Sequence, residues 1–214
     1  VGTAANLLLT SLFAYPLSRK DFKRRNLFAF ILFFTCLFNG GMTASYIVWT
    51  QLFHIKNTVW AYILPGSLMG AMNVLMVRNY YNANIPYAII EAARIDGAND
   101  ARIYTGIMLP LSKPVMTTIG LFAALGYWNN WTNGLYYLDD TSLYSIQNVL
   151  NAINNNIIAI NSVSNMGLAI NKSEIPALTA RMAIAVIGIL PMLCIYPFFQ
   201  KYFVKGITIG AVKG

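Results

Sequence analysis

Charged residues, and the residue types that most often carry enzyme chemistry, are scarce in this sequence. Only 10% of the 214 residues are charged, and the chain has one histidine and two cysteines. His54 has no second candidate ligand nearby, so it does not indicate a metal site. Cys36 and Cys194 lie inside apolar runs, where we expect small buried side chains rather than a disulfide or a reactive thiol. Without a polar catalytic set, the sequence argues against an enzyme.

Two sequence signals are also missing. The pattern G-x-x-x-x-G-K-[ST], which cradles a nucleoside triphosphate in many ATPases, does not occur. No charged leader with a small-residue cleavage site follows the first residue, so nothing indicates a signal peptide. Because the sequence starts with Val1 and not with Met, we expect it to be trimmed or partial.

Apolar residues are in excess. They make up 57% of the chain and give a mean hydropathy of +0.54, against an apolar share of roughly 45–50% in soluble domains. The net charge is +8, yet the basic residues cluster between apolar runs instead of forming one face, which argues against nucleic-acid binding. We therefore predict an all-α, polytopic bundle of membrane-crossing helices, with residues 1–214 as one domain.

Five apolar runs predict membrane crossings. The first covers residues 1–17, and the basic loop 19–25 should stay in the cytoplasm, because a Lys or Arg at mid-bilayer costs about 2.5–3.5 kcal/mol. The second run, residues 27–53, would be about 40 Å long as one helix, too long for an upright crossing. We expect the Asn-Gly-Gly at 39–41 to break it and to leave residues 42–53 as an interfacial segment. One tilted helix is the alternative.

The other three crossings are predicted over residues 58–77, 115–131 and 177–199. A kink is expected at Pro65-Gly66 in the third, since neighbours or water can satisfy the freed carbonyl there. Five crossings put the first residue outside and the tail, residues 200–214, in the cytoplasm. Because this topology is awkward without a signal peptide, we expect that an N-terminal crossing is missing from the sequence.

Residues 132–176 are polar, rich in asparagine and nearly free of basic residues, which predicts an external loop. Ile146, Val149, Leu150 and Ile153 recur at helical spacing, so part of this loop should be an amphipathic helix.

Polar residues near the fourth crossing are candidates for a solute path. Its end carries an aromatic and amide cluster, which is either an interfacial belt or a surface that stacks on sugars: Tyr127, Trp128, Asn129, Asn130 and Trp131. Asn73 in the third crossing is another candidate, because a polar residue inside a span usually faces the bundle interior.

The most informative stretch is residues 86–110, PYAIIEAARIDGANDARIYTGIMLP, which we call the elbow. Five of its residues are charged, although it lies between two apolar crossings: Glu91, Arg94, Asp96, Asp100 and Arg102. It is therefore predicted to be an aqueous segment on the cytoplasmic side.

The elbow should form two short helices around a turn. Pro86 can start the first helix, and Gly97 can end it, because glycine accepts a left-handed conformation. Asn99 or Asp100 can cap the second helix, and Pro110 should stop it. We expect three residues of the second helix to pack back on the bundle and stiffen the unit: Ile103, Tyr104 and Ile107.

The order of residues in the elbow resembles the EAA loop of ABC importer permeases, the MetI-like inner membrane components of binding-protein-dependent transport systems. The pattern matches at Glu91, Ala92, Ala93, Gly97, Ile107, Leu109 and Pro110, with Asp96 and Ala98 in the DGA form common among sugar importers. The tail is similar to that of maltose-permease-like subunits, which places the chain nearest the carbohydrate branch.

The resemblance implies a multi-pass permease subunit in a bacterial plasma membrane that imports sugars, with oligosaccharides as the expected class. Expected partners are a second permease, two ATPase subunits that hold ATP and Mg, an extracellular solute-binding protein and membrane lipid. Glu91 would pair with a basic residue of the ATPase, while Ala92 and Ala93 let the helix seat closely. Four tail residues would reach the ATPase interface: Lys205, Gly206, Gly210 and Lys213.

Two alternatives stay open at this point. The chain could belong to an ABC importer of another polar solute, such as a peptide. A secondary transporter is less favoured, because it would use intramembrane carboxylates for ion coupling and every acidic residue here lies outside the five predicted spans.

Overall fold

The computed structural model describes residues 1–165 and 177–211, and these form helices without any strand, which confirms the all-α prediction. The elements are α1 (Gly2–Ser18), α2 (Arg25–Leu37), α3 (Gly41–Ile47), the π-helix η1 (Val48–Leu52), α4 (Trp60–Ile63), α5 (Ala71–Asn84), α6 (Tyr87–Ile95), α7 (Asp100–Ile103), the π-helix η2 (Tyr104–Met108), α8 (Leu109–Leu111), α9 (Lys113–Trp128), α10 (Thr132–Tyr137), the 3₁₀ turn η3 (Thr141–Leu143), α11 (Ile146–Asn165) and α12 (Ala177–Ala211).

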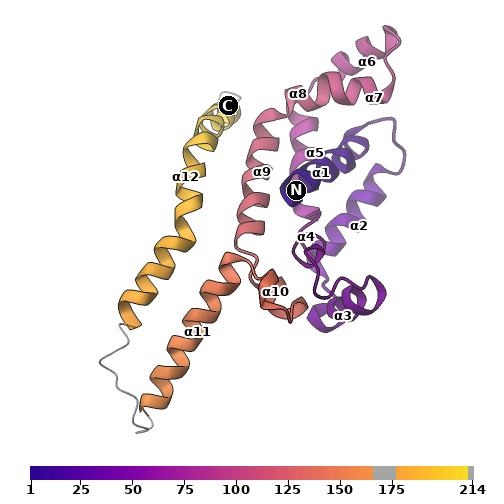
Figure 1. The fold of residues 1–214 in the computed structure, drawn as a ribbon. Helices are drawn as coiled ribbons and strands as arrows, with labels where there is room; N and C mark the ends of the chain where they lie inside the picture. Colours follow the sequence, from indigo (N-terminus) through magenta and orange to yellow (C-terminus); the bar gives the residue numbers. More distant parts are fainter. Residues whose placement is uncertain (166–176, 212–214) are drawn as a thin grey trace.

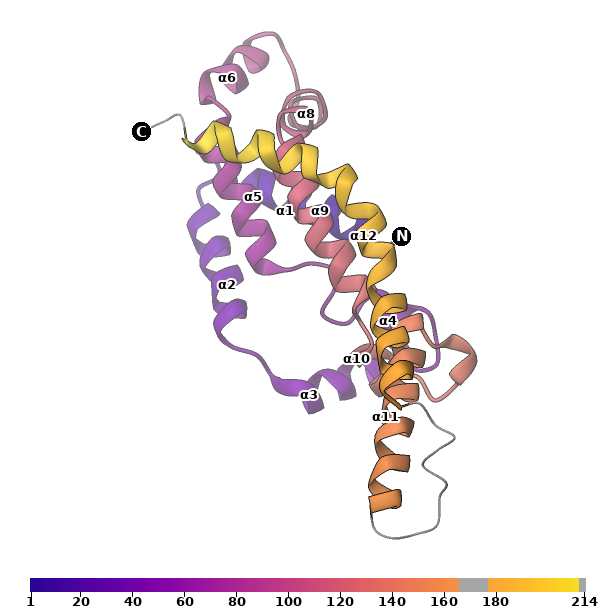
Figure 2. The ribbon, with the colours of Figure 1, turned by 90° about the vertical axis from the view of Figure 1, so that its left-hand side faces the viewer.

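The centre of the fold is a bundle in which α1 packs against α5 and α9, and α2 packs against α5 (Figure 1). The elbow stands at one end of this bundle, and α3 and α10 lie at the other (Figure 1). α12 runs along α9 and returns to the elbow end (Figure 2). The main apolar core joins the bundle to the elbow, with Leu17, Val74 and Ile119 at 3% exposure or less.

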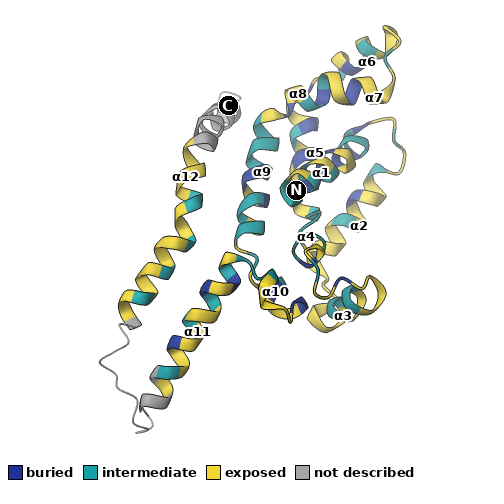
Figure 3. Cartoon of the chain, viewed as in Figure 1, coloured by how far each residue is buried: buried dark blue, intermediate teal, exposed yellow. Residues whose placement is uncertain are grey.

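Two helices turn long apolar faces outward, as expected for a chain surrounded by lipid or by other apolar subunits. The outer faces of α2 and α12 are largely exposed (Figure 3), with Phe30 63% and Leu193 65% exposed. The two cysteines share these faces: Cys36 and Cys194 are exposed, so the prediction that they are buried was wrong. Side chains within an apolar run can face outward when the outer surface of the helix is itself apolar, as it is in α2 and α12.

By length and apolar character, one helical stretch in the described part of the chain could cross a membrane, Leu178–Pro197 of α12. Up to three crossings result if each of two sharply bent helix pairs counts as one span. One pair joins α2 to α3 and η1 with a bend of 111°, and the other joins the α7–α8 stretch to α9 with a bend of 78°. The predicted number of five crossings therefore stays a prediction.

The break in the second apolar run is confirmed. α2 ends at Leu37, and the chain turns through the Asn-Gly-Gly sequence before α3 starts at Gly41. Gly41 has φ +83, a conformation that disfavours residues with a Cβ. The Gly41 N–H donates a hydrogen bond to the Asn39 side-chain oxygen at 2.9 Å. The alternative of a single tilted helix was wrong.

The third apolar run is broken instead of kinked, so the prediction of one helix over residues 58–77 was wrong. α4 is a single turn, residues 64–70 are not helical, and α5 continues to Asn84. Pro65 has no N–H to donate, and Gly66 has φ +69, outside the helical region. We call residues 64–70 the unwound segment.

Three predicted helix ends also differ from the structure. Pro110 does not stop the second elbow helix, which runs to Leu111 and turns at Ser112. The π-helix η2 just before Pro110, with Leu109 N–H bonded to the Tyr104 carbonyl, widens the backbone and accommodates the proline ring. α9 ends at Trp128, three residues early, and α12 continues past residue 199 to Ala211.

The predicted amphipathic helix in the polar loop is confirmed as α11 (Ile146–Asn165). Residues 166–176 of that loop lie outside the described residues. At the same end of the molecule, Lys56 pairs with Asp139 at 2.8 Å. This pair helps to hold the segment before α4 against the end of α10.

Candidate functional site

The first half of the elbow folds as its sequence predicts. Pro86 caps α6, and the helix closes with Gly97 N–H bonded to the Arg94 carbonyl at 3.0 Å and Ala98 N–H to the Ala93 carbonyl at 2.9 Å. Gly97 has φ +79, so the residue expected to reverse the chain does so. Asn99, one of the two predicted caps, accepts the Arg102 N–H at 2.8 Å.

The second half of the elbow anchors it to the bundle. Ile103 is fully buried, Tyr104 is 8% exposed and Ile107 is partly buried in the same core, which confirms their predicted packing. The Tyr104 hydroxyl meets the Ser11 hydroxyl of α1 at 2.6 Å. Met108, 1% exposed, was not singled out from the sequence. The elbow is thus a compact unit packed onto α1 and α5.

The first elbow helix has two different faces. Ile90 is 5% exposed and packs into the core, and Ala93 is half-buried beside it. Glu91 and Ala92 are exposed, and Ile95 at the tip is 87% exposed. A helix with one anchored and one open face, ending in an exposed isoleucine, offers a surface to another molecule.

A group of ionic and polar side chains ties the elbow to the end of α1. The Arg94 guanidinium contacts Asp21 at 2.5 Å and Asp100 at 3.3 Å. Arg19 contacts Asp21 at 3.3 Å, and the Tyr15 hydroxyl donates to Asp100 at 3.2 Å. We call these five residues the clasp: Tyr15, Arg19, Asp21, Arg94 and Asp100.

Charge is strongly stabilised in the clasp. Burial disfavours the ionised form of Asp21, but hydrogen bonds from its own backbone, from Arg19 and from Arg94 outweigh it and lower the pKa of Asp21 to about 2. Hydrogen bonds to Asp21 and Asp100 raise the pKa of Arg94. The Arg19 side chain is only 5% exposed, and its guanidinium lies 5.6 Å from the centre of the Tyr15 ring.

The clasp was missed in the sequence. Residues 19–25 were interpreted as a basic marker of the cytoplasmic side, and neither they nor Tyr15 were expected to contact the elbow. The available signal was Asp21, the one acidic residue in this basic loop. A lone carboxylate there has arginines within reach and is rarely left unpaired.

A second polar group surrounds the unwound segment. The Tyr127 hydroxyl lies within hydrogen-bond distance of the Ile63 carbonyl at 3.2 Å and the Ser67 carbonyl at 3.0 Å. Asn6 of α1, only 4% exposed, donates to the same Ser67 carbonyl at 2.9 Å. Side chains thereby replace hydrogen bonds that an intact helix would make.

Two asparagines from the α9–α10 region complete this group. Asn133 donates to the carbonyls of Ala61 and Pro65 at 3.1 and 3.0 Å. Asn130 donates to the Ser67 hydroxyl at 3.4 Å. Neither Asn6 nor Asn133 was named as a candidate from the sequence, although an asparagine inside an apolar run, as at Asn6, usually faces other helices.

The predicted solute-path residues do not form one cluster. Tyr127 and Asn130 hold the unwound segment, whereas the Trp128 ring N–H donates to the Gly188 carbonyl of α12 at 2.9 Å. Asn129 and Trp131 are exposed, and Asn73 is half-buried near the start of α5. Their role in a solute path stays a prediction.

The described part of the tail lies at the elbow end, where α12 terminates (Figure 2). Lys205, Gly206 and Gly210 belong to the last turns of α12, near the C-terminal mark in Figure 1. Lys213 lies outside the described residues. Their contact with an ATPase stays a prediction.

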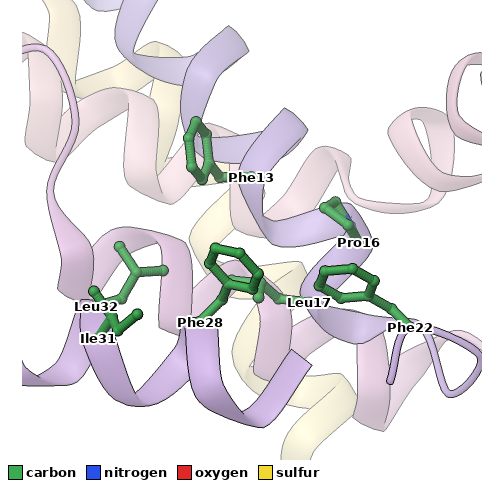
Figure 4. Close-up of a pocket in the computed structure, with 7 residues that line it drawn as sticks. All are labelled: Phe13, Pro16, Leu17, Phe22, Phe28, Ile31 and Leu32. Carbon is green, nitrogen blue, oxygen red and sulfur yellow. The ribbon is translucent and has the colours of Figure 1, made fainter. Parts of the chain in front are cut away.

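An apolar pocket of about 260 Å³ lies between α1 and α2 (Figure 4). Its lining includes Phe13 and Leu17 of α1, Phe22 of the connecting loop, and Phe28 and Leu32 of α2. No polar side chain lines it, so it lacks the hydrogen-bonding groups that a hydroxylated solute needs.

Comparison with known proteins gives three findings. Residues 7–209 match the family described as binding-protein-dependent transport system inner membrane component. The polygalacturonan/rhamnogalacturonan transport system permease protein YtcP of Bacillus subtilis is 40% identical over 214 residues, which is 100% of this chain and 73% of that protein. The arabinooligosaccharides transport system permease protein AraQ of Halalkalibacterium halodurans is 30% identical over 98% of this chain and 68% of its own length.

A solved structure is also similar. The crystal structure of a bacterial ABC transporter involved in the import of the acidic polysaccharide alginate contains a chain with a TM-score of 0.69 and 28% identity. The match covers 94% of this chain and 74% of that one.

Proposed function

The chain belongs to the family of binding-protein-dependent transport system inner membrane components, and on that basis we propose that it is a permease subunit of an ATP-driven importer of oligosaccharides. The names of its relatives support this class of solute, since they refer to polygalacturonan, rhamnogalacturonan and arabinooligosaccharides. A permease subunit is a transport component and not itself an enzyme.

The observation that carries the proposal is the two-faced elbow. Its anchored face is fixed to the bundle by Ile90, Ile103 and Tyr104, and its open face presents Glu91 and Ala92. In the proposed transporter, a partner ATPase holds ATP and Mg and binds the open face of the elbow. Because the elbow is stiff, movement of the ATPase passes to the helices and is not absorbed by a loop.

The proposed complex has further parts. Two ATPase subunits bind at the elbow end, where α12 also terminates, and a second permease covers the exposed apolar faces together with lipid. An extracellular solute-binding protein delivers the sugar at the opposite end, near α10 and α11. This arrangement puts the basic loop 19–25, the elbow and the C-terminal part of α12 in the cytoplasm, as the distribution of basic residues favours.

A different solute is the remaining alternative, and the solute itself can be identified directly. The binding protein encoded beside this chain should be purified without added ligand and its bound molecule analysed by mass spectrometry. We expect an oligosaccharide. A peptide or another non-sugar compound in that protein would contradict the sugar assignment without affecting the transport assignment.

The coupling role is tested by Glu91→Lys in the complete transporter, reconstituted in lipid with its ATPases and binding protein. We expect loss of the ATP hydrolysis that the loaded binding protein stimulates, because the substitution reverses the charge on the open face. Arg24→Glu is the control: it also reverses the charge of an exposed side chain, at a site outside the elbow and with no ion pair among the described residues. Normal stimulation in Glu91→Lys would refute the coupling role.

A further inference from the structure

We propose that α1 carries the displacement of the elbow to the unwound segment, with Arg94 and Asn6 as positioning residues at its two ends. The inference rests on the proposed function, because it states how movement of the elbow reaches the interior of the bundle.

Chain continuity alone does not bring α1 into this movement. The elbow is covalently continuous with α5 and α9, whereas α1 is joined to it only through space. The clasp provides that link, since Arg94 contacts both Asp21, just beyond α1, and Asp100 in the elbow itself. Asp100 in turn accepts a hydrogen bond from Tyr15 of α1 at 3.2 Å.

The link is stiff because it repeats along one stripe of α1. Ser11 and Tyr15 are four residues apart and lie on the same face of α1, and Arg19 follows as the residue that ends the helix. Ser11 meets the Tyr104 hydroxyl at 2.6 Å in a buried contact, and the Tyr15 and Tyr104 rings lie 5.5 Å apart. Arg19 is buried beneath the ring of Tyr87, 5.8 Å from its centre. Successive turns of α1 therefore move with the elbow.

The other end of α1 holds a deformable element. Asn6 is 13 positions before Arg19, which corresponds to about 20 Å along a helix. Its side-chain amide binds the Ser67 carbonyl at 2.9 Å. No backbone N–H of residues 65–69 donates a helical hydrogen bond, so this part of the unwound segment can change conformation at lower cost than the packed helices around it.

This geometry separates two roles within α6. Glu91 is exposed and available to a partner, whereas Arg94, one turn later, contacts the chain's own Asp21. Loss of Glu91 should break the connection to the ATPase. Loss of Arg94 should leave that connection intact and loosen the link between the elbow and α1, because its contacts to Asp21 and Asp100 are lost.

The test measures sugar transported per ATP hydrolysed in proteoliposomes that contain the complete transporter, with the sugar found in its own binding protein as the probe. Arg94→Gln removes the guanidinium that contacts Asp21 and Asp100, and Asn6→Leu keeps a branched side chain but removes the amide that binds the Ser67 carbonyl. Arg102→Gln is the matched control, because Arg102 is an exposed elbow arginine with no ion pair among the described residues.

We expect the ratio of transport to hydrolysis to fall by about fivefold or more in Arg94→Gln and in Asn6→Leu, while the binding protein still stimulates hydrolysis and Arg102→Gln keeps the parent ratio. An unchanged ratio in Arg94→Gln or in Asn6→Leu would overturn the inference. So would loss of stimulated hydrolysis in Arg94→Gln, since Arg94 would then act at the ATPase contact.

A distance measurement tests the rigid link directly. Spin labels are placed at Leu12, an exposed position of α1, and at Ala101, an exposed position of the elbow, in a transporter whose Cys36 and Cys194 are replaced by alanine. Double electron–electron resonance spectroscopy should give the same distance between the labels in the nucleotide-free and ATP-trapped states, and a broader distribution of distances in Arg94→Gln. A distance that differs between the two states would show that the elbow and α1 move independently and would refute the inference, but not the proposed function.

Discussion

The buried hydroxyl pair between Ser11 and Tyr104 allows a sharp test of how the elbow is anchored. Their oxygens are 2.6 Å apart, and Ser11 is also 3.0 Å from the Leu8 carbonyl. The Ser11 hydroxyl can therefore donate its hydrogen bond to the Leu8 carbonyl, while the Tyr104 hydroxyl donates to the Ser11 oxygen. Because of this direction, the two single substitutions should not have equal effects.

Tyr104→Phe removes one hydrogen bond and leaves Ser11 bonded to Leu8, so it should lower the free energy of unfolding by about 1 kcal/mol. Ser11→Ala leaves the Tyr104 hydroxyl buried without its acceptor, at a cost of about 1–3 kcal/mol. The double variant should be no less stable than Ser11→Ala, because it removes the stranded hydroxyl as well.

Thermal unfolding in detergent micelles measures this series. Each 1 kcal/mol corresponds to a fall in Tm of about 2–4 °C for a chain of this size. Thr10→Ala serves as a control in the same helix turn, since Thr10 is equally buried but its hydroxyl makes one long hydrogen bond, to the Asn6 side chain at 3.5 Å. If Tyr104→Phe proved more damaging than Ser11→Ala, the assigned direction of the hydrogen bond would be wrong.

Three further predictions concern the turn, the clasp and the far end of the bundle. Gly97→Ala should destabilise the elbow by about 1–2 kcal/mol through its φ of +79 alone, since no atom lies within 4 Å of an added Cβ; Gly97→Asn should cost less, and equal Tm values would contradict this. The pKa of Asp21 is lowered from 3.8 to about 2, so the stability that its carboxylate gives to the clasp is complete above about pH 4 and is lost as the pH falls towards 2. Hydrogen exchange of α6, corrected for intrinsic rates, should therefore become faster over that range in the parent and not in Asp21→Asn. Gly134→Ala should make α10 more sensitive to protease, because a Cβ there would collide with the buried Asn148 side chain. Gly126→Ala is the control, since a Cβ at that position meets open space. Equal resistance to protease in the two variants would contradict this prediction.

Local rules predicted the elbow well. The start at Pro86, the reversal at Gly97 and the cap at Asn99 depend only on neighbouring residues, and each is where the sequence placed it. The packing of Ile103 and Tyr104 also followed from helical spacing. These features needed no knowledge of the distant parts of the chain.

Features that depend on contacts distant in sequence were missed. The clasp joins residues that lie 73 positions apart, Asp21 and Arg94, and no local pattern pairs them. The third apolar run was predicted to kink at Pro65 because only one hydrogen bond was counted as lost. The complete break is stabilised by hydrogen bonds from Asn6 of α1 and Tyr127 of α9. The sequence of the third run alone does not show that these two side chains lie next to it.

The central claim, that the open face of the elbow receives the ATPase, is tested most directly by photo-crosslinking in the assembled transporter. A photoreactive residue replaces Ile95, which is 87% exposed at the tip, or as a control Val59, which is 60% exposed near the opposite end. The account predicts a crosslink to the ATPase from position 95 and none from position 59. No ATPase crosslink from position 95, or an equal one from position 59, would contradict it.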